Sequence, residues 1–176
     1  EFECSFTAAI KGAYYAKELE EARKQNRITK VPWQKEVLVN TYWDLGISDS
    51  MVIIFAQNCG REIHIIDNYE NNGYGLDHYA AKILEKPYLY GKHFLPHDAQ
   101  ARELGTGRSR YEILQSLLGR DKIKIVKNIG VKDGIDALRI LFNRIWIDDQ
   151  KCLQLTDALG SYTQEWDDKK GMFRDK

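Results

Sequence analysis

An acidic residue closes an apolar segment in the first third of the chain. Asp44 lies in the stretch Tyr42 to Ser50, between apolar segments over residues 36–40 and 51–57. Asp is a poor strand former, so an Asp at the end of an apolar strand and close to Gly46 lowers stability unless a partner compensates. A carboxylate aimed into a cleft is a hard oxygen ligand for Mg²⁺ or Mn²⁺. The stretch is therefore a candidate metal site, and the alternative is a tight turn with Asp and Ser caps.

A second acidic residue, Asp98, closes a predicted strand over residues 88–97. The predicted element order favours a sheet in which this strand lies beside the strand that ends at Asp44. The two carboxylates would then lie a few ångströms apart at one edge of the sheet, where they repel each other unless a cation is bound. Two-metal phosphodiester hydrolysis uses ions about 3.5–4 Å apart, which such a pair of carboxylates can hold.

Three arginines surround a glycine-containing loop just after the second carboxylate. Arg102, Arg108 and Arg110 flank the segment 105–107, Gly-Thr-Gly. Glycine lets a backbone approach closely, and arginine binds phosphate oxygens with charge-assisted hydrogen bonds. We expect this loop to bind a DNA backbone; the alternative is a solvated loop held by an ion network of the Arg102–Glu103 type. The formal net charge of the chain is zero, so any nucleic-acid contact depends on such a local basic patch.

Two further polar residues each have two interpretations. Glu70 follows the third predicted strand, where it is either an accessory acid of the site or part of the turn chemistry before Asn71-Asn72-Gly73. His97 precedes Asp98, where it either orders a water or a phosphate, or is structural if it lies on the opposite face of the strand.

The elements that must position these residues follow from the periodicity of the apolar residues. Helices are predicted over 8–28, 76–85, 109–118, 132–142 and 150–166, and strands up to Asp44 and over 51–57, 62–69, 88–97 and 123–127. Ser109 with Glu112 forms a capping box. The short turns between the first three strands imply an antiparallel meander, and the helices between the later strands imply parallel additions. The predicted fold class is α/β, with a mixed sheet of three antiparallel and two parallel strands flanked by helices.

Length and composition are those of one globular domain over residues 1–176. The three cysteines are scattered and odd in number, which is typical of a reducing compartment and gives neither a disulfide framework nor a zinc spacing. No apolar run approaches membrane-spanning length, so no membrane partner is expected.

Several motifs together resemble the nuclease domain of the large terminase subunit of tailed bacteriophages. The most specific are Trp43-Asp44-Leu45-Gly46 with Ser48-Asp49-Ser50, the stretch Ile65 to Glu70, and the stretch His97 to Arg110. Weaker similarity lies in Phe2 to Phe6, Gly12 to Tyr15, Asp133 to Ala137 and Met172 to Asp175. The resemblance covers essentially the whole chain.

The resemblance implies an RNase H-like fold and an endonuclease, dependent on Mg²⁺ or Mn²⁺, that cuts concatemeric double-stranded DNA during genome packaging. It implies that Asp44 is the first metal ligand, Asp98 the second carboxylate, and Asp49 an accessory acid that binds metal directly or through water. It also implies the phage portal and the small terminase subunit as partners, in the cytoplasm of the host cell.

The chain departs from this family in one respect. The family places a third metal-binding Asp in a late helix, in a segment of the kind His-x-Ala-Asp-Ala, and no such segment occurs here. We therefore expect an excised domain with a truncated C-terminal end, in which residues 1–33 are a helix and connection from an absent ATPase domain, since no Gly-x-x-x-x-Gly-Lys-Ser/Thr loop is present. Such a fragment is expected to bind metal weakly and to cut poorly.

Two alternative functions remain open from the sequence. One is another RNase H-fold nuclease of the resolvase type, although the Thr-Gly-Arg-Ser-Arg context is not expected there. The other is a non-catalytic module that docks on the portal or on DNA without cutting.

Overall fold

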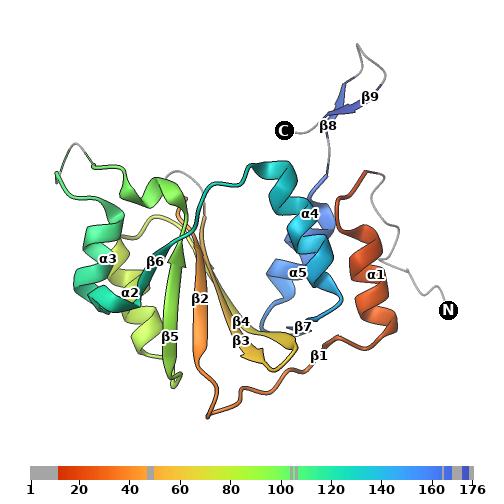
Figure 1. The fold of residues 1–176 in the computed structure, drawn as a ribbon, viewed down its shortest axis with the longest axis horizontal. Coiled ribbons are helices and arrows are strands. Elements are labelled where there is room, and N and C mark those ends of the chain that lie inside the picture. The colour runs from red at the N-terminus through yellow and green to blue at the C-terminus, as the bar shows by residue number, and fades with distance from the viewer. Residues whose placement is uncertain are drawn as a thin grey trace.

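A seven-stranded mixed sheet forms the centre of the protein (Figure 1). The structure is a computed structural model that describes residues 12–46, 50–103, 105, 107–163, 165–167 and 172–174. The strand order is β1-β7-β4-β3-β2-β5-β6. The strands of this sheet are β1 (Ile28–Thr29), β2 (Val39–Asp44), β3 (Met51–Cys59), β4 (Glu62–Asn71), β5 (Tyr90–Leu95), β6 (Ile123–Ile125) and β7 (Ile145–Asp148).

The sequence pattern explains the middle of this sheet. β2, β3 and β4 form the expected antiparallel meander, β5 pairs in parallel with β2, and β6 pairs in parallel with β5. The hairpin between β3 and β4 turns at Gly60, whose φ of 65° is strained for residues with a Cβ. The expected three antiparallel and two parallel strands are therefore confirmed.

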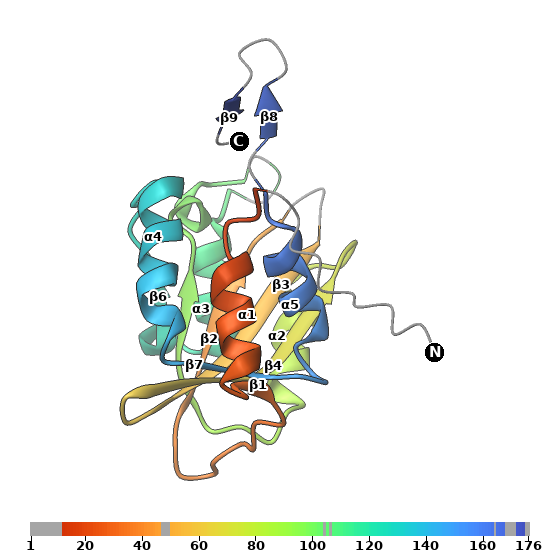
Figure 2. The same cartoon turned by 90° about the vertical axis from the view of Figure 1, so that its right-hand side faces the viewer.

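Helices cover both faces of the sheet (Figures 1 and 2). α2 and α3 lie on one face, and α1, α4 and α5 on the other. The helices are α1 (Ala16–Lys24), α2 (Leu76–Leu84), α3 (Arg110–Leu118), α4 (Val131–Phe142) and α5 (Leu153–Ser161), with short 3-10 turns η1 (His97–Gln100) and η2 (Arg120–Lys122). One buried cluster joins β2, β3 and β5 to α2 and α3, and a second joins β7 to α1, α4 and α5.

The sequence analysis missed two strands of the sheet. β7 pairs in parallel with both β4 and β1, at the edge where no strand was expected. Its four residues are too few to show a period, and its last residue, Asp148, is buried as a cap that accepts hydrogen bonds from the Val31, Gln150 and Lys151 amides. Burial of an acid at the end of a strand needs such donors, and they come partly from distant sequence.

The ends of the chain also differ from expectation. The helix predicted over 8–28 is shorter: α1 begins at Ala16 and ends at Lys24, and Ile28 belongs to β1. The part of the prediction before residue 12 lies outside the described residues. The helix predicted over 150–166 is shorter, since α5 ends at Ser161 and β8 (Glu165–Asp167) pairs antiparallel with β9 (Met172–Arg174). Among the described residues, no helix combines the length and the apolar character that crossing a membrane requires.

Candidate functional site

The two strands that lead to the predicted carboxylates are parallel neighbours. β2 pairs with β5, with Tyr42 opposite Phe94, and Asp44 is the last residue of β2. Asp98 does not close a strand as expected: β5 ends at Leu95, and Asp98 lies in the 3-10 turn η1 that follows. Pro96, which lacks an amide hydrogen, separates the two elements. Both acidic residues are exposed. Asp44 is at the carboxyl end of β2, and Asp98 lies shortly after the carboxyl end of the adjacent parallel strand β5, so they lie at the same edge of the sheet.

The face of the sheet beside Asp44 is partly open. Tyr42 and Phe94 stack on this face with ring centroids 5.0 Å apart, and Tyr42 is 39% exposed. Side chains alternate along a strand, so Asp44 projects to the same face as Tyr42, whereas Trp43 is buried on the opposite face. Asp44 therefore stands at the end of an apolar, solvent-accessible strip rather than in the core.

A buried polar ladder joins β2 to β5 on the opposite face. The indole Nε1 of Trp43 donates to Thr41 Oγ1 at 2.8 Å, and Thr41 Oγ1 lies 2.7 Å from His93 Nδ1. Because the hydroxyl oxygen accepts from Trp43, its proton is free to donate to a neutral imidazole. Burial, with a smaller effect of Lys122, lowers the pKa of His93 to about 4, so the ladder is uncharged at neutral pH. It fixes the pairing of the two strands that lead to the carboxylates.

Glu70 lies in the same cross-strand row as Asp44. Asp44 is opposite Val52 on β3, and Val52 is opposite Glu70 on β4. Directly opposite residues project to the same face, and two strand spacings place the two acidic Cα atoms roughly 10 Å apart. Glu70 is exposed and lies three residues before Gly73. This position is compatible with both predicted roles, an accessory acid and a residue of the turn.

His97 lies beside the loop that leads from β6 to α4. Its Nε2 accepts a long contact of 3.4 Å from Asn128 Nδ2, and the side chain is exposed. His97 is therefore not on the buried face with His93, and both interpretations of its role remain predictions.

The three arginines of the glycine-containing loop have different surroundings. Arg102 is exposed, and its backbone bridges to Ser109. Arg108 is exposed and lies along α3, donating to the Glu112 carbonyl at 3.2 Å. Arg110 is turned inward: its side chain is 13% exposed, and it donates to Leu45 O and to Glu103 Oε1. An ion pair involving Glu103 does exist, with Arg110 rather than with Arg102.

The start of α3 has the expected cap. Ser109 Oγ accepts from the Glu112 amide at 3.2 Å, and Glu112 Oε2 accepts from the Ser109 amide at 2.8 Å. The Ser109 amide holds the pKa of Glu112 below its usual value. The capping box is confirmed, and it fixes the direction in which Arg108 and Arg110 leave the loop.

Asp44 and Asp98 are two exposed acidic residues at this edge. Carboxylate oxygens are the ligands that Mg²⁺ and Mn²⁺ prefer. Asp49 lies outside the described residues, and among the residues that the structure describes no group of three or more His, Cys, Asp or Glu side chains is placed to hold a metal ion.

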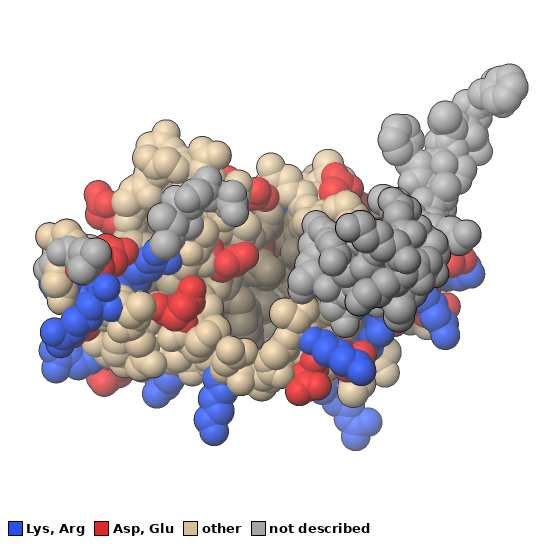
Figure 3. Space-filling view, turned by 90° about the horizontal axis from the view of Figure 1, so that it is seen from above, with Lys and Arg blue, Asp and Glu red and all other residues tan. Residues whose placement is uncertain are grey.

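Viewed from above, where β2 and β5 end, acidic side chains lie beside a hollow in the surface, and Lys and Arg side chains lie on several sides of the molecule (Figure 3). A chain of zero net charge needs a local basic patch to contact nucleic acid.

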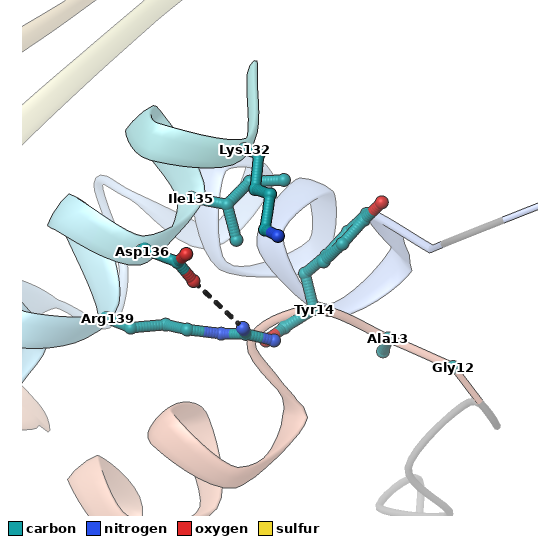
Figure 4. A pocket seen from close by; sticks show the side chains of 7 residues that line it. All are labelled: Gly12, Ala13, Tyr14, Lys132, Ile135, Asp136 and Arg139. Carbon is teal, nitrogen blue, oxygen red and sulfur yellow. Dashed lines mark hydrogen bonds and ion pairs between the residues drawn. The ribbon is translucent and has the colours of Figure 1, made fainter. Parts of the chain in front are cut away.

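A separate pocket of about 330 Å³ lies between α4 and the residues that precede α1 (Figure 4). Gly12, Ala13, Tyr14, Lys132, Ile135, Asp136 and Arg139 line it. Arg139 donates twice to the Tyr14 carbonyl and once to Asp136, so its guanidinium is used to attach the chain before α1 to α4. None of the predicted site residues lines this pocket, and we assign it a structural role.

These observations define an α/β domain whose candidate site is a pair of carboxylates at one edge of a mixed sheet. No protein-family model and no curated protein sequence matches the chain. Solved structures, however, are similar in fold.

The similar structures are large terminases. The large terminase of a thermophilic bacteriophage, in complex with ADP, has a TM-score of 0.59 and 16% identity, over 93% of this chain and 40% of that chain. The nuclease domain from the thermophilic phage G20c with bound cobalt has a TM-score of 0.56 and 14% identity, over 94% and 87% of the two chains. The nuclease domain from bacteriophage SPP1 with bound Mn has a TM-score of 0.52 and 14% identity, over 78% and 74%.

The chain therefore has the fold of large terminase nuclease domains, and the predicted fold class is confirmed. It spans about 40% of the length of the large terminase that was solved with ADP. At these identities the likeness concerns the fold, and the roles of individual residues rest on the geometry described above.

Two features of the site were not foreseen from the sequence. The Thr41–His93 hydrogen bond joins residues 52 positions apart, and the Arg110–Leu45 hydrogen bond joins residues 65 apart. The sequence did indicate the Thr41–His93 hydrogen bond, because a Thr and a His within apolar strands need buried partners. No local pattern indicated the second.

Proposed function

We propose that this chain is a divalent-metal-dependent endonuclease domain that cuts double-stranded DNA, as part of a phage terminase. The observation that carries the proposal is the placement of Asp44 at, and Asp98 shortly after, the carboxyl ends of adjacent parallel strands, at one edge of the sheet. The fold of terminase nuclease domains and the cobalt and Mn bound in two of them support it.

The residues of the chain divide the work of hydrolysis. Asp44 and Asp98 would hold Mg²⁺ or Mn²⁺, with Asp49 and Glu70 as accessory acids. The bound metal supplies activation of water and stabilisation of the leaving oxygen. Arg102 and Arg108 would bind phosphates of the DNA backbone, and His97 would order water or phosphate next to Asp98.

The wider biological role is part of the same proposal. By its resemblance to terminases, the substrate is concatemeric viral DNA in the host cytoplasm, and the portal and the small terminase subunit are the partners. These assignments extend from larger proteins to a chain that matches 40% of one of them, so they need a separate test of binding.

Cleavage of supercoiled plasmid in Mn²⁺ or Mg²⁺ tests the catalytic proposal. We expect slow nicking and linearisation by the wild-type chain, suppressed by EDTA and abolished by Asp44→Asn or Asp98→Asn. Asp121→Asn is the matched control, because Asp121 is an exposed acid at the opposite end of the sheet, just before β6. DNA binding without metal-dependent cleavage would favour the non-catalytic docking module, and cleavage that survives Asp44→Asn would exclude the proposed mechanism.

A further inference from the structure

Arg110 is the first residue of α3, and its guanidinium has two partners inside the protein. Nη1 donates to the Leu45 carbonyl at 2.8 Å, and Nε donates to Glu103 Oε1 at 3.1 Å. With 13% of its side chain exposed, Arg110 is less accessible than Arg102 and Arg108. Its surroundings therefore differ from those of the exposed arginines in the same loop.

The two partners belong to the two segments that carry the carboxylates. Leu45 directly follows Asp44 and lies past the last residue pair of the β2–β3 ladder, Asp44 opposite Val52. Glu103 lies in the segment that leaves η1, where the Ala101 amide donates to the Asp98 carbonyl at 2.9 Å. Arg110 thus connects the chain immediately after one carboxylate to the chain that follows the other.

The loop that presents Arg110 is itself closed by hydrogen bonds. The Glu103 amide donates to the Arg108 carbonyl at 3.0 Å, and the Gly107 amide donates to the Glu103 carbonyl at 2.8 Å. With the Ser109 cap at the start of α3, this leaves the Arg110 backbone little freedom. A planar guanidinium with two directed hydrogen bonds then transmits that fixed position to Leu45.

We propose that Arg110 is a positioning residue that sets the spacing between Asp44 and Asp98 through Leu45 and Glu103. The inference rests on the proposed function, because the spacing matters for holding a divalent cation. Groups that orient metal ligands without touching the metal commonly change metal affinity by about 10–100-fold when they are lost. Arg102 is exposed and directly precedes Glu103. Its substitution removes a positive charge from the same loop and leaves the hydrogen bonds of Arg110 to Leu45 and Glu103 in place.

The test compares Arg110→Met, Arg110→Lys and Arg102→Met in the 176-residue chain. Four quantities are measured: Mn²⁺ affinity by electron paramagnetic resonance, amide hydrogen exchange in peptides covering Leu45 and residues 101–103, the salt dependence of DNA binding, and the melting temperature. We expect Arg110→Met to weaken Mn²⁺ binding about tenfold or more. We also expect it to accelerate exchange in both peptides and to leave the salt slope unchanged. Arg110→Lys, whose single ammonium cannot reproduce the two-partner fork, should lie between Met and wild type.

Arg102→Met is the matched control and should show the reverse pattern, with a smaller salt slope and unchanged Mn²⁺ affinity. If Arg110→Met changes only the salt slope, Arg110 binds phosphate and the inference is overturned. If it lowers only the melting temperature, its role is general stability, which also overturns the inference. If the wild-type chain binds no Mn²⁺, the proposed function fails by itself, and the exchange data alone then decide whether Arg110 joins the two segments.

Discussion

Asp44 and Glu70 lie in one row across three strands, with Val52 between them on the same face of the sheet. Glu70 therefore lies at the same edge of the sheet as Asp44, with the two Cα atoms about two strand spacings apart. At that separation Glu70 can reach a shared ion through a water rather than replace a direct ligand.

Glu70→Gln should therefore weaken cleavage and Mn²⁺ affinity severalfold, and less than Asp44→Asn, for which we expect at least about a hundredfold loss. Single-turnover cleavage and Mn²⁺ titration measure both effects. Glu36→Gln is the matched control, because Glu36 is an exposed acid that precedes β2 at the opposite edge. If Glu70→Gln and Glu36→Gln reduce cleavage and Mn²⁺ affinity equally, Glu70 contributes only to the turn before Gly73.

The exposed arginines of the loop should determine how salt affects DNA binding. Each phosphate contact contributes about 0.9 to the slope of log K against log salt concentration. The double variant Arg102→Ala/Arg108→Ala should thus reduce this slope by about 1 to 2, as measured by fluorescence anisotropy over a salt series. Arg120→Ala, at the other end of α3, serves as the control. An unchanged slope in the double variant would remove the loop from the DNA interface.

The buried His93 should make the stability of the protein depend on pH. Its folded-state pKa is about 4, below the value of 6.5 for a free histidine, so between these values the unfolded chain binds more protons than the folded chain. The free energy of unfolding should therefore fall as the pH is lowered from 6.5 toward 4, by up to roughly 3 kcal/mol from this group.

Urea unfolding at a series of pH values measures this dependence. His93→Asn keeps an acceptor near Thr41 and should flatten the profile in this range, at the cost of lower stability at pH 7. His97→Asn, at an exposed histidine, is the control and should leave the profile as in wild type. A profile that keeps its slope in His93→Asn would assign the dependence to other groups.

Asp67 anchors the segment after α2 to the sheet through a largely buried ion pair. Its Oδ2 accepts from Lys86 Nζ at 2.6 Å and from the Tyr88 hydroxyl at 2.9 Å, with side-chain exposures of 10% for Asp67 and 27% for Lys86. Burial first, and then the Asp67 carboxylate, raises the pKa of Tyr88 above its usual value. Asp67 thus has a structural role rather than one at the metal edge.

Lys86→Met should lower the free energy of unfolding by roughly 1–3 kcal/mol, because it leaves a buried carboxylate without its cation. The double variant Asp67→Leu/Lys86→Met should recover part of this loss, and a double-mutant cycle by thermal unfolding measures the coupling. Additive losses would show that the pair is not coupled. Cleavage activity should be unchanged in Lys86→Met, since neither Asp67 nor Lys86 belongs to the candidate site.

The sequence was sufficient for the elements whose periodicity is complete. The β2–β4 meander, the parallel addition of β5 and β6, and the cap of α3 at Ser109 all follow local rules of alternation, turn chemistry and capping. β1 and β7 have two and four residues, too few for a period. β7 is a strand because it pairs with β4, and β1 because it pairs with β7. Tertiary pairing decided these elements, so sequence patterns could not.

For the site, the edge was predictable and its detailed construction was not. That Asp44 and Asp98 follow neighbouring strands came from topology, whereas the 3-10 turn that carries Asp98 depends on Pro96 and on contacts of η1 with α3. Spacing placed Arg110 among the DNA-binding arginines, and that role stays untested. Its inward orientation depends on a carbonyl 65 positions away, which no pattern within the loop encodes.

The parallel pairing of β2 with β5 also has a consequence for how the protein is made. In the chain, β3, β4 and α2 lie between Tyr42 and Phe94, so these elements are synthesised before the two residues can pair. Closing this long intervening segment costs conformational entropy before the contacts between β2 and β5 form. We therefore expect the β2–β5 pairing to form late in folding. A nascent chain that has been synthesised only as far as β4 contains Asp44 but not Asp98, so it lacks one of the two acidic residues of the candidate site.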